Sequence, residues 1–278
     1  MITIGDVIIK KLTIHIISLT VFLILTFIGS FSNIKILTAI GAVSSAVLGS
    51  VISIILESVS TQNQTVKLWW DHIKYYNKNI RLSFSYLYRI QVDGKYLLVK
   101  GNRLKNQYQP IGGVYKYYNE AKPFLESINY IPDTRMKNNE ETDDLRIQIK
   151  GKYLLEFMQW FLSMKNREYD PSREFKEELL TTKLLPANSF KILHYRKIAF
   201  HNKGLTYSKY NNCIEFLYAD IFELTLTEDQ KQIIRESVKK HPKSLCLADS
   251  DELKSMCHNG IEKNLGNNAK WLIGEYDE

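Results

Sequence analysis

Three glutamates in one short segment are the residues with the clearest capacity for chemistry. They are spaced at i, i+3 and i+4, so a helix would place them on one face: Glu174, Glu177 and Glu178. Carboxylates crowded on one face repel each other unless a cation lies among them. Oxygen ligands of this kind suit Mg²⁺ or Mn²⁺, which can bind a pyrophosphate. The alternative is a solvated helix face on which Arg173 and Lys176 balance the acids.

The segments before the glutamates predict a β-hairpin and a glycine turn. Large apolar residues alternate with other residues over 80–92, a period of two that is typical of a strand. Asp93-Gly94 predicts a two-residue turn, and residues 95–100 supply the returning strand. The pair Gly112-Gly113 follows shortly afterwards. Together these segments would place a glycine-rich loop ahead of the acidic helix.

The remaining pattern predicts further strands and helices. Residues 190–201 and 213–219 are expected to be strands, and Thr227 with Gln230 forms a capping box for a helix that ends near Lys240. Residues 153–164 are rich in large apolar groups and are expected to be a helix, packed in the core or lying against a membrane surface. Strands occur both before and between helices, so the predicted fold class is α+β.

The order of these elements resembles the Nudix family. Its signature is a glycine, five residues, a glutamate, seven residues, and then R-E-U-x-E-E-x-G-U, where U is apolar. Gly113 matches the opening glycine, and five residues match R-E-U-x-E-E: Arg173, Glu174, Phe175, Glu177 and Glu178. The resemblance implies that Glu174, Glu177 and Glu178 are metal ligands, with Glu177 and Glu178 as catalytic candidates. It also implies that Gly112, Gly113 and Arg173 contact a ligand.

The chain departs from this signature at three places. Asn119 stands where the first glutamate is expected, with Glu120 displaced by one. Residues 121–172 replace the seven-residue spacer, so the motif is split by an insertion, and Leu180 replaces the glycine after the glutamates. Because catalysis tolerates little misplacement of a metal relative to the attacking water, we expect a nucleotide receptor rather than an efficient hydrolase.

The N-terminal part of the chain contains two long uncharged stretches. They predict transmembrane helices at about 12–31 and 36–56, joined as a hairpin. A pair of buried core helices and a cleaved signal peptide are the alternatives. Lysines flank the pair on both outer sides, which predicts a multi-pass membrane protein with both termini in the cytoplasm. The expected organisation is an anchor at 1–57, a juxtamembrane linker at 58–79 and a Nudix-like domain at 80–278.

The second uncharged stretch carries small residues at a spacing of four: Gly41, Ser45, Gly49 and Ser53. Such a row allows helices to approach closely. It would serve packing within the hairpin, self-association between chains, or both.

The composition adds weaker constraints. The formal net charge is +7, which suits an anionic partner such as a nucleotide or a lipid surface. Three cysteines without a CxxC pair argue against a disulfide framework in the cytoplasm. The spacing of Cys246, Cys257 and His258 matches no metal-binding motif.

The whole chain resembles the two-transmembrane, SMODS-associated Nudix effectors of bacterial CBASS anti-phage systems. The resemblance implies an N-terminal two-helix transmembrane hairpin followed by a Nudix-like α/β/α sandwich. It implies that this domain senses a cyclic oligonucleotide second messenger, and that the helices then assemble as a homo-oligomer and disrupt membrane lipid in the bacterial inner membrane, causing abortive infection. DNA is not an expected partner. The alternatives are a membrane-tethered Nudix hydrolase acting on a nucleoside diphosphate derivative, and a membrane scaffold for a protein partner.

Overall fold

The computed structural model describes Val21, Ile24 and residues 63–101, 107–133, 143–261 and 264–274. The chain divides into two compact units, Met1–Trp70 and Asp71–Glu278. Helix α3 (Asn63–Lys74) begins in the first unit, so part of the predicted linker is helical. The second unit contains the sheet and the glutamates, and the following description concerns that unit.

The predicted architecture needs correction. Among the residues that the structure describes, no helix combines the length and the apolar character needed to cross a membrane. Crossing a bilayer takes about 20 residues of helix, whereas α7, one of the longer helices described, has 13. The expected transmembrane hairpin followed by an α/β/α sandwich is therefore wrong, and the structure instead shows a mixed, sheet-rich α/β domain. The segments 12–31 and 36–56 lie outside the described residues except for Val21 and Ile24.

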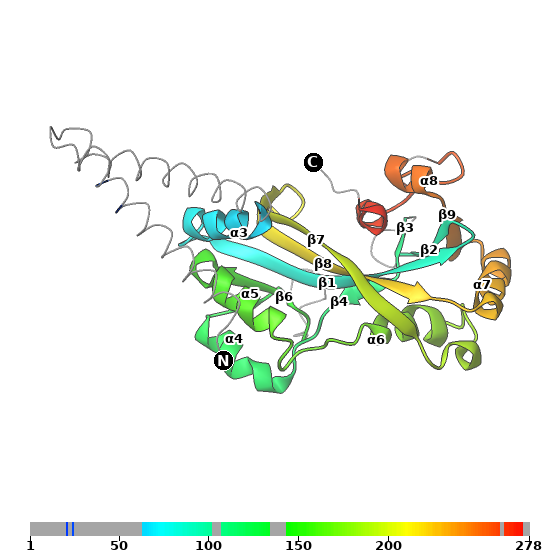
Figure 1. The fold of residues 1–278 in the computed structure, drawn as a ribbon, viewed down its shortest axis with the longest axis horizontal. Helices are drawn as coiled ribbons and strands as arrows, with labels where there is room; N and C mark the ends of the chain where they lie inside the picture. Colours follow the sequence, from blue (N-terminus) through cyan, green and yellow to red (C-terminus); the bar gives the residue numbers. More distant parts are fainter. Residues whose placement is uncertain are drawn as a thin grey trace, which may run out of the picture. The chain divides into compact units, whose positions relative to one another are not determined.

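Strand β1 (Asn79–Val92) organises the sheet, as Figure 1 shows. One edge of β1 pairs in parallel with β8 (Cys213–Thr225), which in turn pairs with the antiparallel strand β7 (His194–Ser208). The other edge pairs first with β6 (Arg146–Lys150) and then with β4 (Gly112–Val114). The short strand β5 (Ile131–Pro132) extends the sheet beyond β6.

The far end of β1 turns back as the predicted hairpin. Asp93 and Gly94 have φ angles of 52° and 77°, the positive values that a tight two-residue hairpin turn requires. The returning strand β2 (Lys95–Lys100) pairs with β3 (Tyr108–Pro110) and with β9 (Leu245–Ala248). This hairpin continues the sheet toward the C-terminal part of the chain.

Short helices pack around the sheet. They are α4 (Lys122–Ser127), α5 (Leu154–Leu162), α6 (Ser172–Phe175), α7 (Glu228–Lys240), α8 (Ser250–Ser255), and the 3₁₀ helices η1 (Asn119–Ala121), η3 (Gly151–Tyr153), η5 (Ala187–Phe190) and η6 (Asn267–Ile273). The predicted capping box of Thr227 and Gln230 is present at the start of α7. In the view of Figure 1, α4, α5 and α6 lie below β1, with α7 at the right.

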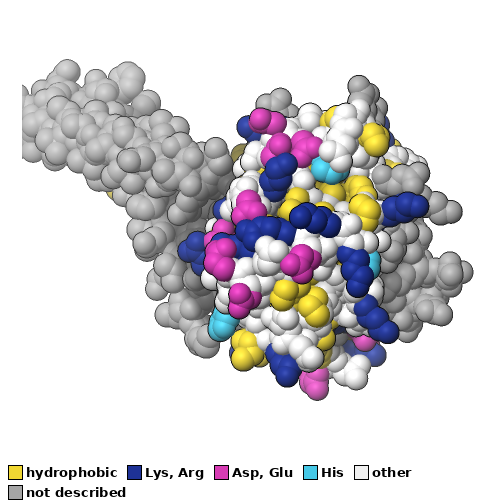
Figure 2. All heavy atoms as spheres, turned by 90° about the vertical axis from the view of Figure 1, so that its right-hand side faces the viewer, with side chains coloured by type: hydrophobic (Ala, Val, Ile, Leu, Met, Phe, Trp, Pro, Cys, Tyr) yellow, Lys and Arg dark blue, Asp and Glu magenta, His cyan; other side chains and the backbone are white. Residues whose placement is uncertain are grey.

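Charges of both signs are mixed on the face near α7. Figure 2 shows Lys and Arg side chains interspersed there with Asp and Glu. Two ion pairs of this region are Lys231 with Glu228, at 2.7 Å, and Arg235 with Asp93, also at 2.7 Å. The positive net charge of the chain is therefore not gathered into a uniform basic patch on this face.

An aromatic cluster on one face of β1 forms much of the core. Phe84 is fully buried, and its ring centroid lies 5.1 Å and 4.4 Å from those of Phe157 and Phe161 on α5. On β8, Phe216 and Tyr218 stack on the same ring at 5.7 Å and 5.1 Å. The apolar residues of α5 therefore serve the core in this structure, one of the two roles expected for that segment.

Phe84→Ala tests this cluster. We expect the substitution to lower the free energy of unfolding by about 3–5 kcal/mol, because it leaves a cavity at the junction of β1, β8 and α5. Phe200→Ala is the matched control, since Phe200 stacks only on Tyr218 among these rings and is 41% exposed. Chemical denaturation of the full chain, followed by tryptophan fluorescence, measures both. Equal losses in the two variants would contradict the assignment of the core.

Candidate functional site

The segment that carries the glutamates is helical but not a regular α-helix. After α6, residues Lys176–Thr181 form a π-helix, whose turn is wider than that of the predicted α-helix. Such π-helical turns are rare and occur often at functional sites. Glu174, Glu177 and Glu178 all line one cavity. The side chain of Glu177 is nevertheless 56% exposed, against 17% for Glu174.

The two glycines of β4 allow the glutamates to approach the sheet. A Cβ atom at Gly113 would lie 1.9 Å from Oε1 of Glu174, so only glycine leaves room for this carboxylate. At Gly112 the backbone N–H donates to Oε2 of Glu178 at 3.1 Å, and a Cβ atom would lie 2.1 Å from the carbonyl oxygen of Tyr86. The structure thus brings the predicted residues Gly112 and Gly113 together with two of the predicted glutamates.

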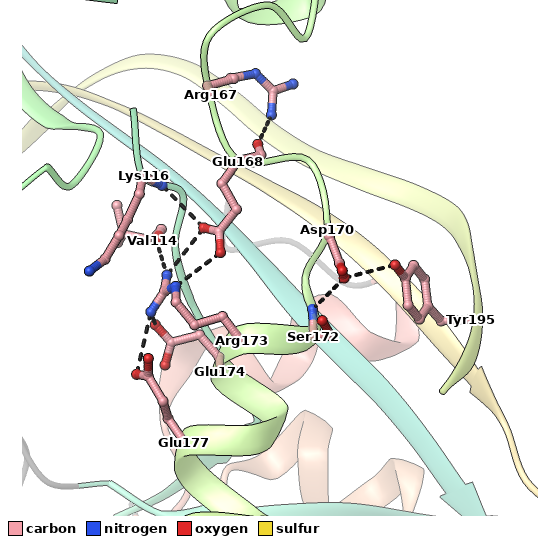
Figure 3. A network of polar contacts seen from close by, with 10 residues as sticks. All are labelled: Val114, Lys116, Arg167, Glu168, Asp170, Ser172, Arg173, Glu174, Glu177 and Tyr195. Atoms are coloured by element: carbon pink, nitrogen blue, oxygen red, sulfur yellow. Dashed lines mark hydrogen bonds and ion pairs between the residues drawn. The ribbon is translucent and has the colours of Figure 1, made fainter. Parts of the chain in front are cut away.

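Arg173 is the centre of the polar network drawn in Figure 3. Its Nε and Nη2 donate to the carboxylate of Glu168 at 2.9 Å and 3.2 Å, and its Nη1 donates to Oε1 of Glu174 at 2.6 Å. Nη2 also donates to the carbonyl oxygen of Val114 at 2.9 Å, while Nη1 lies 3.4 Å from Oε2 of Glu177. One guanidinium therefore connects the acidic helix to β4 and to Glu168.

Burial sets the protonation behaviour of this network. Desolvation raises the pKa of Glu174 above its ordinary value, and the adjacent positive charge of Arg173 opposes that rise. Burial also disfavours the charged form of Arg173, but the hydrogen bond with Glu168 and the neighbouring carboxylate charges outweigh it and raise the pKa of Arg173. The guanidinium therefore remains positively charged and offsets part of the negative charge of the three carboxylates around it.

The cavity beside this network has a volume of about 1240 Å³. Its sheet wall comes from the face of β1 opposite the aromatic core, and its other walls include β4, the acidic helix and η6: Arg81, Ser83, Ser85, Leu87, Gly112, Gly113, Asn268 and Trp271. From Arg81 to Leu87 the rise of the strand alone is about 20 Å. The cavity is therefore extended along β1 rather than confined to the glutamates.

Five basic residues line the cavity: Arg81, Lys100, Lys116, Arg146 and Arg173. The three arginines are paired with carboxylates, for example Arg81 with Asp133 and Glu215, and Arg146 with Asp144. Within the described part of the chain, no carboxylate lies within ion-pair distance of the ammonium group of Lys100 or Lys116. These two lysines are therefore the cations left to bind an anionic ligand.

The family assignment follows from a comparison with family models. Residues 79–273, well over half of the chain, match the model of the SMODS-associated NUDIX domain. The chain belongs to this family. No curated protein and no solved structure matched the chain in the other two comparisons. Membership in the SMODS-associated Nudix family points to a CBASS-type effector with a Nudix-like domain.

Nudix domains generally use divalent metals such as Mg²⁺ or Mn²⁺, but the glutamates as placed here do not fit such an ion. Oε1 of Glu174 is bound to Arg173, Oε2 of Glu178 accepts from Gly112, and Glu177 points largely to solvent. Among the described residues, no group of three or more His, Cys, Asp or Glu side chains converges closely enough to hold a metal. The guanidinium of Arg173 supplies the positive charge that the sequence pattern assigned to a cation.

The insertion in the signature is part of the domain fold. Between the glycines and the acidic helix it contributes α4, β5, β6 and α5, and β6 pairs directly with β1. Asn119, at the position of the missing glutamate, opens the 3₁₀ helix η1 and is exposed. The predicted packing row of Gly41, Ser45, Gly49 and Ser53 lies outside the described residues.

Sequence reasoning missed most of the cavity wall. The large residues on β1 predict a strand, but the residues between them also carry information. Ser83 and Ser85 alternate with Leu82, Phe84 and Tyr86. Small polar residues on one face of a strand with large apolar residues on the other are a signal for a hollow on that face. The pairing of Arg173 with Glu168 had no comparable signal in the spacing of the sequence.

Gly113→Ala tests the contact between β4 and the acidic helix. We expect it to lower the free energy of unfolding by about 1–3 kcal/mol, because the added methyl group overlaps the Glu174 carboxylate. In a Glu174→Ala background the same substitution should cost much less, since the obstructing group is gone. A double-mutant cycle of unfolding free energies measures this coupling. An equal cost in both backgrounds would contradict the proposed close approach.

Proposed function

We propose that this chain is a receptor for a cyclic oligonucleotide and acts as an effector in CBASS-type anti-phage defence. The observation that carries the proposal is the extended cavity with its two unpaired lysines, because a cyclic oligonucleotide is both large and polyanionic. Pockets for small organic ligands are usually about 300–1,000 Å³, and this cavity has about 1240 Å³. Its size favours an oligonucleotide over a single nucleotide.

The charges of the cavity support the same ligand class. An ammonium group is a strong, compact partner for phosphate oxygens, and Lys100 and Lys116 reach the cavity from β2 and from the segment after β4. The arginines are already engaged by carboxylates, so binding phosphate through them would require breaking ion pairs. Two separate lysines suit a ligand with more than one phosphodiester.

A metal-dependent Nudix hydrolase is the second candidate function. The observation that favours it is that Glu174, Glu177 and Glu178 all line the cavity next to the glycines of β4. Their contacts with Arg173 and Gly112 favour the receptor instead, because these contacts already occupy oxygens that a metal would need. Inner-membrane localisation and self-association stay predictions, since the segments on which they depend lie outside the described residues.

Replacing both lysines tests the receptor proposal. We expect Lys100→Ala with Lys116→Ala to weaken binding of cyclic di- and trinucleotides by about tenfold or more per lysine, the usual size of a hydrogen bond to a charged group. The matched control is Lys239→Ala with Lys240→Ala, which removes the same charge from the exposed end of α7. Isothermal titration calorimetry of the full chain measures all three proteins.

Two outcomes would contradict the proposal. One is that the wild-type chain binds no member of a panel of cyclic di- and trinucleotides. The other is that the wild-type chain releases mononucleotide or phosphate from nucleoside diphosphate derivatives with Mg²⁺ or Mn²⁺, and that Glu177→Gln abolishes the release. The second outcome would establish the hydrolase.

A further inference from the structure

One end of the cavity is a hollow in the face of the sheet above Ser83. The register of the strands places Ser83 between Arg146 on β6 and Leu217 on β8. Arg81 and its β8 neighbour Glu215 lie one step along the same face. Since successive side chains on a strand alternate between its faces, Ser83 and Ser85 form a small-residue floor there, and both line the cavity.

The side of this hollow is formed by a buried polar cluster. Arg81, only 3% exposed, donates to Oδ2 of Asp133 at 2.5 Å and to Oε2 of Glu215 at 3.1 Å. Oε2 of Glu215 also accepts from the side-chain amide of Asn211 at 2.8 Å. These bonds fix the orientation of the Glu215 carboxylate, because both donors hold the same oxygen.

The second oxygen of that carboxylate has no partner. Among the described residues, no donor lies within hydrogen-bond distance of Oε1 of Glu215, although the residue is only 8% exposed. This oxygen is open to the cavity, because it is not one of the fully buried polar atoms that lack a partner. A donor on a ligand can therefore replace the water that solvates it. Glu215 also lines the cavity, so a ligand in the hollow can supply the missing donor.

We propose that this hollow is a nucleobase subsite and that Glu215 accepts a hydrogen bond from an exocyclic amino group of the base. This inference rests on the proposed function and adds a preference among ligands. The floor of small residues and Leu217 leaves room for a flat ring, while the Glu215 acceptor selects a base with an exocyclic amino group at its edge. Adenine, guanine and cytosine carry such an amino group, whereas hypoxanthine and uracil do not.

The inference assigns the two ends of the ligand different partners. Lys100 and Lys116 would contact phosphates, whereas Glu215 would contact a base. A phosphate in the hollow is disfavoured because three carboxylates, those of Asp133, Asp144 and Glu215, face the two guanidinium groups of Arg81 and Arg146. Among the described residues, both guanidinium groups are already in ion pairs, unlike the ammonium groups of the two lysines.

Cyclic dinucleotides that differ by one amino group give the direct test. Cyclic di-inosinate is cyclic di-guanylate without the two exocyclic amino groups. We expect the wild-type chain to bind the guanine or the adenine compound at least tenfold more tightly than the inosine compound, because the inosine compound lacks the exocyclic amino group that would donate to Glu215. Titration calorimetry of the full chain with the three compounds measures the ratio.

Glu215→Gln gives a readout that a merely structural role would not move. The donors of Arg81 and Asn211 would hold the amide oxygen of the new side chain, which turns its NH₂ group toward the hollow. We expect the preference for the amino-bearing base to be lost or reversed.

Ser83→Leu fills the hollow without touching the ion pairs and should weaken binding at least tenfold. Ser127→Leu, on the exposed end of α4, is the control for an added leucine.

The outcomes separate this inference from the receptor proposal. Equal affinity of the wild-type chain for the guanine, adenine and inosine compounds would overturn the base subsite and leave the receptor intact. Unchanged binding by Ser83→Leu would do the same. Binding of none of these compounds, nor of cyclic triadenylate, would overturn both.

Discussion

The two faces of β1 impose the constraint on which the rest of the domain depends. A strand directs successive side chains to opposite faces, and on β1 all the large apolar residues except Leu87 fall on one of them. Phe84 and its neighbours pack there against α5 and β8, which fixes the sheet and its register. On the opposite face only Leu87 joins an apolar cluster, whereas Arg81, Ser83 and Ser85 offer no apolar surface for a covering layer. The cavity lies on that face as a direct consequence.

The acidic helix meets this cavity through the glycines of β4. Without side chains at Gly112 and Gly113, the carboxylates of Glu174 and Glu178 approach the sheet, and Arg173 supplies the charge that makes their proximity favourable. A partly buried guanidinium bound to several carboxylates is costly to remove, because the carboxylates would be left uncompensated. The helix residues of the family signature thus act in this structure as an ion-paired support for one cavity wall.

Part of this arrangement could be predicted from the sequence. The alternation in β1, the Asp93-Gly94 turn and the capping box at Thr227 are local signals, and the structure contains each of these elements. The link between the glycines and the glutamates came from the family resemblance. The π-helical turn at Lys176–Thr181 could not be predicted, because helical spacing in a sequence is read with the period of the α-helix.

Other features depend on contacts between distant segments. Glu168 and Arg173 are close in sequence, but their role appears only when Lys116 and Val114 of a remote strand come beside them. The parallel pairing of β1 with β8, which brings Glu215 to Arg81, joins residues more than a hundred positions apart. The expected transmembrane hairpin has no counterpart among the described helices, none of which is long and apolar enough to cross a membrane.

A crystal structure of the full chain with the tightest-binding cyclic oligonucleotide tests the central claim most directly. The account predicts ligand density along the face of β1, with phosphates beside Lys100 and Lys116 and a base over Ser83. It also predicts that Arg173 keeps its contacts with Glu168 and Glu174. Ligand density elsewhere on the domain, or a metal ion held by Glu174, Glu177 and Glu178 with Arg173 displaced, would contradict the account.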